Sequence, residues 1–293
     1  MQDIRPENYR IHLIPDLTQF SFAGHVTLVV EAPAAIGALR LNILDLEISD
    51  CAVEQNGDWI ECAFETDVEK EEMQILLPQK MEGAIRIQIR YEGQINDKMA
   101  GFYRSQYTHS GKTQYIAVTQ FEESDARRAF PCMDHPAKKA TFDIIMDIDR
   151  ALVAISNGAI DHETSLDNGK KRVTFEQTPK MSTYLVFFGV GEFEFTRDTE
   201  DPRVRVATLP GMKPYAMFGL EFGRKSLAFS EDYYGIPYPL PKMDLIAIPD
   251  FAFGAVENWG AITFRENLLL HYPEITSRSG EERICEVIAH EIA

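Results

Sequence analysis

The stretch Ile85-Arg86-Ile87-Gln88-Ile89-Arg90-Tyr91 alternates apolar and polar residues without a break. Successive side chains of a strand point to opposite faces of a sheet, so this stretch predicts a strand with one buried and one wet face. Turn signals such as Asn56-Gly57 and Asp167-Asn168-Gly169 separate further runs of the same period. These runs cover residues 25–31, 141–149, 171–176 and 184–195. The pattern predicts an all-β domain of sandwich type over residues 1–197.

Beyond residue 197 the pattern changes. Residues 214–234 have helical character, and the apolar runs at 244–249 and 260–265 predict buried strands. A last helix is predicted from a capping box, Ser279 with Glu282, and from a stripe of isoleucines at 284, 288 and 292. We therefore expect residues 198–293 to form a second region, of mixed α/β type. Because the sequence ends inside this helix, part of the stripe should be exposed and open to association with another chain.

Composition limits the class of protein. The chain has 293 residues, of which 45% are hydrophobic and 26% are charged, as in soluble globular proteins. Its formal net charge of −17 argues against nucleic acid and anionic membranes as partners, because both attract basic surfaces. No apolar stretch is long enough to span a bilayer, and residues 1–6 do not open a leader peptide. We expect a cytoplasmic protein.

The four cysteines, at positions 51, 62, 132 and 285, form no Cys-x-x-Cys pair. Neither a cysteine zinc site nor a dense disulfide framework is indicated, so reduced and mostly buried thiols are expected. A bridge between Cys51 and Cys62 stays open for an oxidising compartment.

The residues with the most specific chemistry stand at the end of the sequence. His290-Glu291-Ile292-Ala293 matches the first four positions of an His-Glu-x-x-His helix. Residues four apart share a helix face, so two imidazoles of such a helix hold one metal while the Glu reaches the metal's water. One His and the Glu are present, and the second His is not. Taken alone, a His-Glu pair on a helix is more often a surface feature than a ligand set.

Two further clusters change the interpretation of this pair. One is Phe253-Gly254-Ala255-Val256-Glu257-Asn258-Trp259-Gly260, and the other runs from Thr119 to Cys132 with the sequence TQFEESDARRAFPC. With the His-Glu pair, they resemble the zinc aminopeptidases of the aminopeptidase N type, in the gluzincin group. That family has a GAMEN motif where this chain has GAVEN, and a TQFExTDARRAFPCxDEP segment from which Ser124 and His135 depart. The resemblance covers essentially the whole chain.

The resemblance implies a fold and a set of roles. The fold is a mostly β, saddle-like N-terminal sandwich domain followed by the start of an α/β, thermolysin-like catalytic domain. Glu122 and Glu257 would bind the ammonium of a peptide's free N-terminus, which is costly to desolvate unless carboxylates replace its water. The substrate backbone would lie along the GAVEN strand, at Gly254, Ala255 and Asn258, with Glu257 reading its amino end. Residues matching Gln120 and Phe253 would line the pocket for the first side chain.

For catalysis, the resemblance implies one zinc ion, which would polarise the scissile carbonyl and lower the pKa of a water molecule towards about 7. His290 would be one ligand, and Glu291 would take a proton from the water and pass it to the leaving amine. The other ligands would lie beyond Ala293. The 293 residues alone are therefore expected to be inactive and to bind zinc weakly, whereas the natural full-length protein is expected to hydrolyse N-terminal residues from peptides.

Two alternatives stay open. A non-catalytic, peptide-binding or scaffold relative with the same fold would explain the incomplete metal site. An epoxide hydrolase of the leukotriene type shares the zinc site, but Glu122 favours peptide amines as ligands.

Overall fold

The computed structural model describes residues 4–293, which form two compact units that interleave along the sequence. The first unit contains residues 4–103, 119–150 and 160–186. The second contains residues 104–118, 151–159 and 187–293. These units are defined by contacts within the folded chain, and such contacts do not test where an evolutionary domain ends. The domain boundary between residues 197 and 198 therefore stays a prediction.

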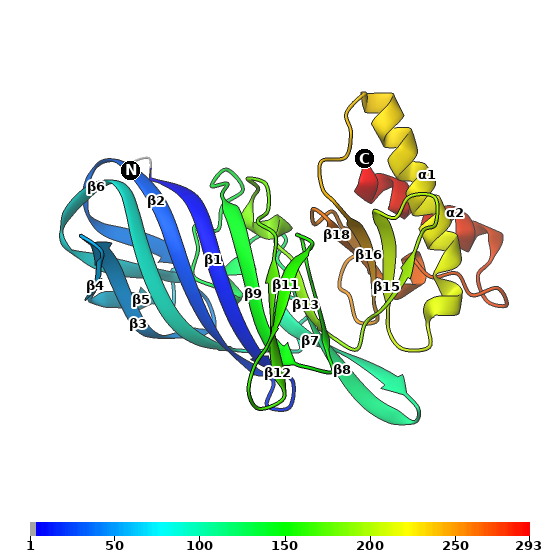
Figure 1. The fold of residues 1–293 in the computed structure, drawn as a ribbon, viewed down its shortest axis with the longest axis horizontal. Coiled ribbons are helices and arrows are strands. Elements are labelled where there is room, and N and C mark those ends of the chain that lie inside the picture. Colours follow the sequence, from blue (N-terminus) through cyan, green and yellow to red (C-terminus); the bar gives the residue numbers. More distant parts are fainter. Residues whose placement is uncertain (1–3) are drawn as a thin grey trace. The chain divides into compact units, whose positions relative to one another are not determined.

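The first unit is built on one large sheet. Its described strands number nine, in the order β11-β12-β9-β1-β2-β6-β3-β4, with β5 pairing β6. All neighbours are antiparallel except β1 and β9. Figure 1 shows β6, β2, β1 and β9 side by side. The strands are β1 (Arg5–Asp16), β2 (Ser21–Asn42), β3 (Leu46–Gln55), β4 (Asp58–Glu61), β5 (Phe64–Asp67), β6 (Glu72–Gln94), β9 (Thr141–Asp149), β11 (Ile160–Ser165) and β12 (Lys170–Phe175).

The alternating stretch at residues 85–91 lies in β6 as predicted. Ile85, Ile87 and Ile89 are buried, while the intervening Arg86 and Arg90 are exposed. The buried face meets the equally buried Val26, Leu28 and Val30 of β2, each opposite one of the three isoleucines. A period of two in the sequence thus fixes which face of β6 joins the core.

One predicted strand is wrong. Residues 184–195 divide into the end of a 3₁₀ turn (Thr183–Leu185), β13 (Phe188–Gly191) and the start of β14 (Glu194–Arg197). The reason is that residues 185–188 are all buried, so this segment has no wet face and the apparent alternation does not correspond to one sheet. The hairpin at Asn56-Gly57 is confirmed, since both residues have positive φ, of 54° and 93°, between β3 and β4.

The second unit contains most of a four-stranded antiparallel sheet of the order β10-β13-β8-β7. Its strands are β7 (Gly101–His109), β8 (Lys112–Gln120), β10 (Val153–Ser156) and β13.

The rest of the second unit is a mixed α/β layer. The described strands form the order β14-β15-β16-β18-β17, in which β15, β16 and β18 are parallel. Helix α1 (Met217–Tyr234) provides the crossover from β15 to β16 that parallel strands need. Both α1 and α2 (Arg278–Ile292) lie beside this sheet in Figure 1. The strands are β14, β15 (Val204–Thr208), β16 (Met243–Ile248), β17 (Ala255–Val256) and β18 (Ala261–Arg265), and further 3₁₀ turns cover Ala126–Arg128, Lys213–Tyr215 and Glu266–Leu268.

Helix α2 corrects two expectations. Its N-cap is Ser277, whose Oγ accepts a hydrogen bond of 3.2 Å from the Gly280 amide, so the predicted capping box at Ser279 is wrong. The isoleucine stripe is also not exposed. Ile284 and Ile288 are buried, and Ile292 packs partly buried against the same apolar cluster of strands and helices. The expected association with another chain through an exposed stripe is therefore not supported.

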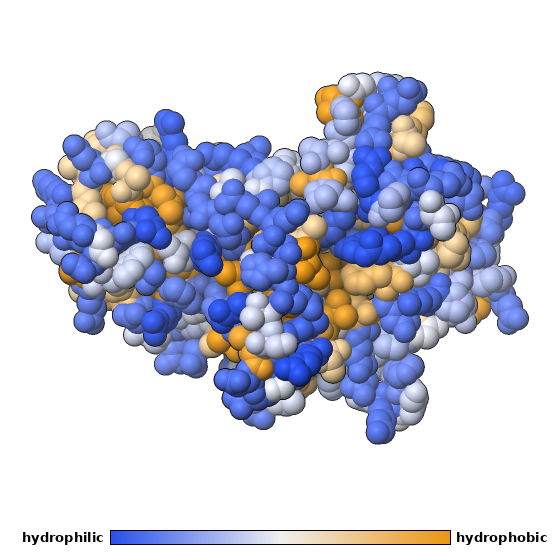
Figure 2. All heavy atoms as spheres, in the orientation of Figure 1, coloured by the Kyte–Doolittle hydropathy of each residue, from blue (hydrophilic) through white to orange (hydrophobic). Residues whose placement is uncertain are grey.

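The order of structural classes is as predicted, with a largely β N-terminal part followed by a mixed α/β region. All four cysteines are free, and only Cys285 is partly exposed rather than buried. Burial raises the pKa of the Cys51 thiol to about 12. Hydrophilic side chains predominate on the face shown in Figure 2, in keeping with the charged fraction of the sequence. Among residues 4–293, no helix is both long and apolar enough to cross a membrane.

Candidate active site

The His-Glu pair lies in the last turn of α2. His290 is exposed and Glu291 is half-buried. The preceding turns anchor the helix through Ile284, Val287 and Ile288 in the core of the second unit. Within the described part of the chain, no group of three His, Cys, Asp or Glu side chains is arranged to hold a metal ion. His290 on its own does not make a zinc site, because such sites need three or four protein ligands.

The GAVEN segment forms the edge of the mixed sheet. Ala255 and Val256 are β17, which pairs antiparallel with Phe264 and Thr263 of β18 on one side. Strand β17 is the last in the sheet order, so its second edge pairs with no strand among the residues described. An open edge offers backbone donors and acceptors to an extended peptide.

Gly254 stands just before this edge strand. A Cβ added there would meet only Leu268 Cδ1, at an ordinary contact distance of 3.4 Å, and Gly254 does not have a positive φ. Packing inside the described chain therefore does not require a glycine at this position. Arg265 holds the adjacent loop, because its amide donates to Gly254 O at 2.9 Å and its guanidinium donates to the carbonyls of Phe251 and Ala252. Phe253, on this loop, is 44% exposed.

The turn after β17 carries Glu257, whose side chain is half-buried. Asn258, the next residue, is 3% exposed, and its Nδ2 donates to Thr263 Oγ1 at 3.1 Å. Its carbonyl accepts from the Ala261 amide at 3.0 Å. The Asn258 side chain therefore holds the turn together, a structural role that its place in the motif did not indicate.

Two residues that no sequence pattern indicated contact this turn. Asn157 Nδ2 donates to Trp259 O at 2.8 Å, and the Lys242 ammonium donates to Gly260 O at 2.7 Å. Both come from segments distant in sequence. The Ser156-Asn157-Gly158 stretch gives only a turn signal, and Lys242 follows a proline-rich loop with nothing to mark it as buried. Only the tertiary fold brings them to Glu257's turn.

The remaining predicted site residues belong to the first unit. Gln120 ends β8 and is 2% exposed, and neither Nε2 nor Oε1 of its buried amide has a hydrogen-bond partner among the described residues. Buried amides without partners are rare in proteins and call for an explanation such as a missing ligand or water. Glu122 is exposed just after this strand. Its convergence with Glu257, which belongs to the second unit, stays a prediction.

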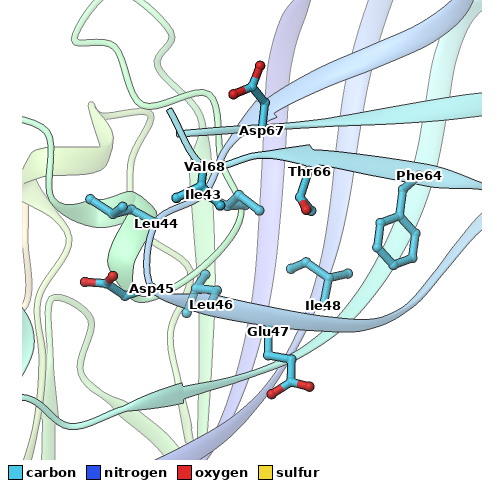
Figure 3. Close-up of a pocket in the computed structure, with 10 residues that line it drawn as sticks. All are labelled: Ile43, Leu44, Asp45, Leu46, Glu47, Ile48, Phe64, Thr66, Asp67 and Val68. Atoms are coloured by element: carbon cyan, nitrogen blue, oxygen red, sulfur yellow. The ribbon is translucent and has the colours of Figure 1, made fainter. Parts of the chain in front are cut away.

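A cavity of about 530 Å³ in the first unit is a different site. It lies between β5 and the beginning of β3, and none of the predicted site residues lines it. Figure 3 shows Leu46, Ile48 and Thr66 pointing towards one another across it, while Glu47 and Asp67 point away. Apolar side chains such as Leu46, Ile48 and Phe64 make up much of its lining.

Known protein families match both parts of this chain. Residues 5–185 match the peptidase M1 N-terminal domain, and residues 218–293 match the peptidase family M1 domain. The chain is 42% identical to the puromycin-sensitive aminopeptidase of Caenorhabditis elegans over 98% of its own length and 31% of that protein. It is 40% identical to aminopeptidase M1 of Arabidopsis thaliana, over 98% of the chain and 34% of that protein. The alanine/arginine aminopeptidase of Saccharomyces cerevisiae is 36% identical, over 99% and 34%.

The class of protein follows from these matches: the β-rich N-terminal part lies within the M1 N-terminal domain, and β17, the acidic turn after it and the helix with the His-Glu pair lie within the M1 peptidase domain. The chain belongs to the peptidase M1 family. It spans about a third of the length of the curated relatives that it matches.

Proposed function

We propose that the natural protein containing these residues is a zinc-dependent aminopeptidase that removes N-terminal residues from peptides. The observation that carries this proposal is the edge strand β17, whose second edge pairs with no strand among residues 4–293 and which is followed directly by Glu257. An extended peptide that pairs with this edge would end at a carboxylate, which suits a free α-ammonium.

Gly254 supports the same function. Since no contact within the described chain requires its missing Cβ, the glycine is explained by close approach of a substrate backbone. Gln120 adds a second line of support, because a substrate would satisfy its unpartnered buried amide. Within the second unit we assign Phe253 to the pocket for the first side chain, Glu257 to the ammonium, and Gly254 and Ala255 to the substrate backbone.

His290 would provide one zinc ligand, and the remaining ligands are not among the described residues. Zinc, when bound, would polarise the scissile carbonyl. Glu291, the residue after His290, would accept a proton and return it to the leaving amine. As partners we propose peptides with free N-termini, and as location the cytoplasm, where the free thiols of the cysteines would persist.

The test is the substitution Glu291→Gln in the protein at its natural length. It removes the proton acceptor but keeps the size of the side chain, so hydrolysis of an aminoacyl anilide should fall by at least about 10²-fold. Glu286→Gln, on an exposed side of the same helix and paired with Arg283, is the matched control and should leave the rate unchanged. A chelator should also abolish activity.

Full activity of the Glu291→Gln protein would contradict the assigned role. A zinc-loaded wild-type protein that binds peptides but never hydrolyses them would instead support the non-catalytic alternative.

A further inference from the structure

We propose that Lys242 is a positioning residue for Glu257, acting through the carbonyl of Gly260. This inference rests on the proposed aminopeptidase function, because it assigns to Lys242 a part in recognising the substrate's amine. Lys242 would act without contacting the substrate.

The Lys242 ammonium is buried and fully engaged. The residue is 6% exposed, and its Nζ donates to Ser156 O and Gly260 O, both at 2.7 Å. The third partner is Asp244 Oδ2, at 2.8 Å. An ammonium has three donors, so each of them has one acceptor.

The charge of Lys242 is balanced locally. Asp244 is fully buried, and it also accepts two hydrogen bonds from Arg205, at 2.5 and 2.7 Å. Burial lowers the pKa of Lys242, while Asp244 acts in the opposite direction. Buried ion pairs are weak evidence for stability, since well-packed apolar replacements are often as stable. Beyond any effect on stability, Lys242 fixes the positions of Ser156 and Gly260 relative to each other, because its ammonium binds the carbonyls of both residues.

Next to these two carbonyls, a second hydrogen bond joins the same two segments of the chain. Asn157 follows Ser156 and bonds to Trp259 O, the carbonyl before that of Gly260. The Asn157 amide group is itself fixed, since its Oδ1 accepts from the Phe187 amide at 2.8 Å. Residues 156–157 and 259–260 are therefore joined by two adjacent links, one from Lys242 and one from Asn157.

These links leave the turn after β17 little freedom. Asn258 is held to Thr263, Trp259 to Asn157, and Gly260 to Lys242. Glu257 directly precedes these three anchored residues and follows the paired strand β17. A carboxylate on such a turn is preorganised to meet an ammonium, and small misplacements of a binding group are costly. Removing the Lys242 link should therefore weaken recognition of the amine more than contacts with the rest of the substrate.

The experiment compares two ligands in the protein at its natural length. In the Glu291→Gln background, in which hydrolysis of leucinamide is suppressed, calorimetry gives the dissociation constants of leucinamide and of 4-methylpentanamide, which has the same carbon skeleton and no amine. Their ratio measures amine recognition and requires no turnover. In Lys242→Met the ratio should fall by about tenfold or more, with little change for 4-methylpentanamide. Lys225→Met, which removes an exposed lysine paired with Glu221 on α1, should leave the ratio unchanged.

Urea unfolding first establishes that Lys242→Met folds. If it does not, Lys242→Gln, which keeps a polar donor in the site, takes its place. An unchanged ratio in a folded variant overturns the inference. This includes the case in which both ligands bind more weakly by the same factor, which is what a merely structural role would give. A Glu291→Gln protein with Lys242 intact that does not distinguish the two ligands overturns the proposed function as well, so the two failures can be told apart.

Discussion

Gly254 and Gly260, six residues apart, differ in what requires a glycine at each position. Gly260 has a φ of +75°, and a Cβ there would lie 2.3 Å from the carbonyl oxygen of Asn157. Gly254 has neither constraint. Structure inside the chain therefore explains Gly260, whereas the proposed substrate explains Gly254.

Gly260→Ala should destabilise the second unit strongly. The substitution adds the strain of a left-handed conformation, about 1–2 kcal/mol, to a collision with backbone that cannot move aside. The control is Gly235→Ala at the end of α1, where φ is +65° and no atom lies within 4 Å of the added Cβ. Urea unfolding should show the larger loss for Gly260→Ala, and equal losses would contradict the close approach to Asn157.

Asp147 of β9 should make stability depend on pH in the acid range. Burial raises the pKa of this carboxyl, but the hydrogen bonds from Arg172, at 2.7 and 2.8 Å, and the nearby His12 outweigh that, so the pKa is lowered. A lowered pKa contributes stability that is present above the unfolded value of about 3.9 and is lost as pH falls through the folded value.

Asp147→Asn should therefore be less stable at pH 7 and should lose less stability than the wild type between about pH 5 and pH 3. Urea unfolding at several pH values measures this slope, with the exposed Asp149→Asn as control. Identical slopes for wild type and Asp147→Asn would show that the ion pair contributes nothing.

Among the secondary-structure elements, hydrophobic periodicity predicted strands better than sequence motifs predicted helix caps. Residues 141–149 coincide with β9, and the run at 244–249 differs from β16 by one residue at each end. The capping error in α2 arose because Ser277 and Ser279 are both acceptable N-caps, and the sequence does not say which one has extended backbone. In the structure Ser277 does, with a φ of −73° and a ψ of 168°.

Ser277→Ala should thus destabilise α2 by about 1 kcal/mol, the usual value of an N-cap. Ser279→Ala, in the first turn, loses only the hydroxyl contact with Ser277 and should change the free energy of unfolding by less than about 0.5 kcal/mol. A larger effect at Ser279 would restore the predicted capping box.

The candidate site was predictable where it depends on motifs and not where it depends on tertiary contacts. Glu257 and His290 follow from local sequence patterns. Lys242 and Asn157 do not, because their roles depend on carbonyls brought in from other segments. Asn258 is an intermediate case, since its position was singled out but its contact with Thr263 was not.

At the scale of the whole molecule, charge is the main feature that no single element explains. A net charge of −17 produces self-repulsion that salt screens. The midpoint of urea unfolding should therefore rise as sodium chloride increases from about 20 to about 200 mM, over which the Debye length shortens markedly. A falling midpoint would mean that the many surface ion pairs outweigh the net repulsion.

We have proposed that residues 4–293 of this M1 chain carry the amine-recognising part of an aminopeptidase. The most direct measurement compares hydrolysis of leucine p-nitroanilide with that of its N-acetyl derivative by the zinc-loaded protein at natural length. We expect rapid release of nitroaniline from the free amine. Because acetylation removes the charge that Glu257 is proposed to bind, we expect at least about 10²-fold slower release from the acetylated compound. Equal rates for the two compounds, or no hydrolysis of either, would contradict it.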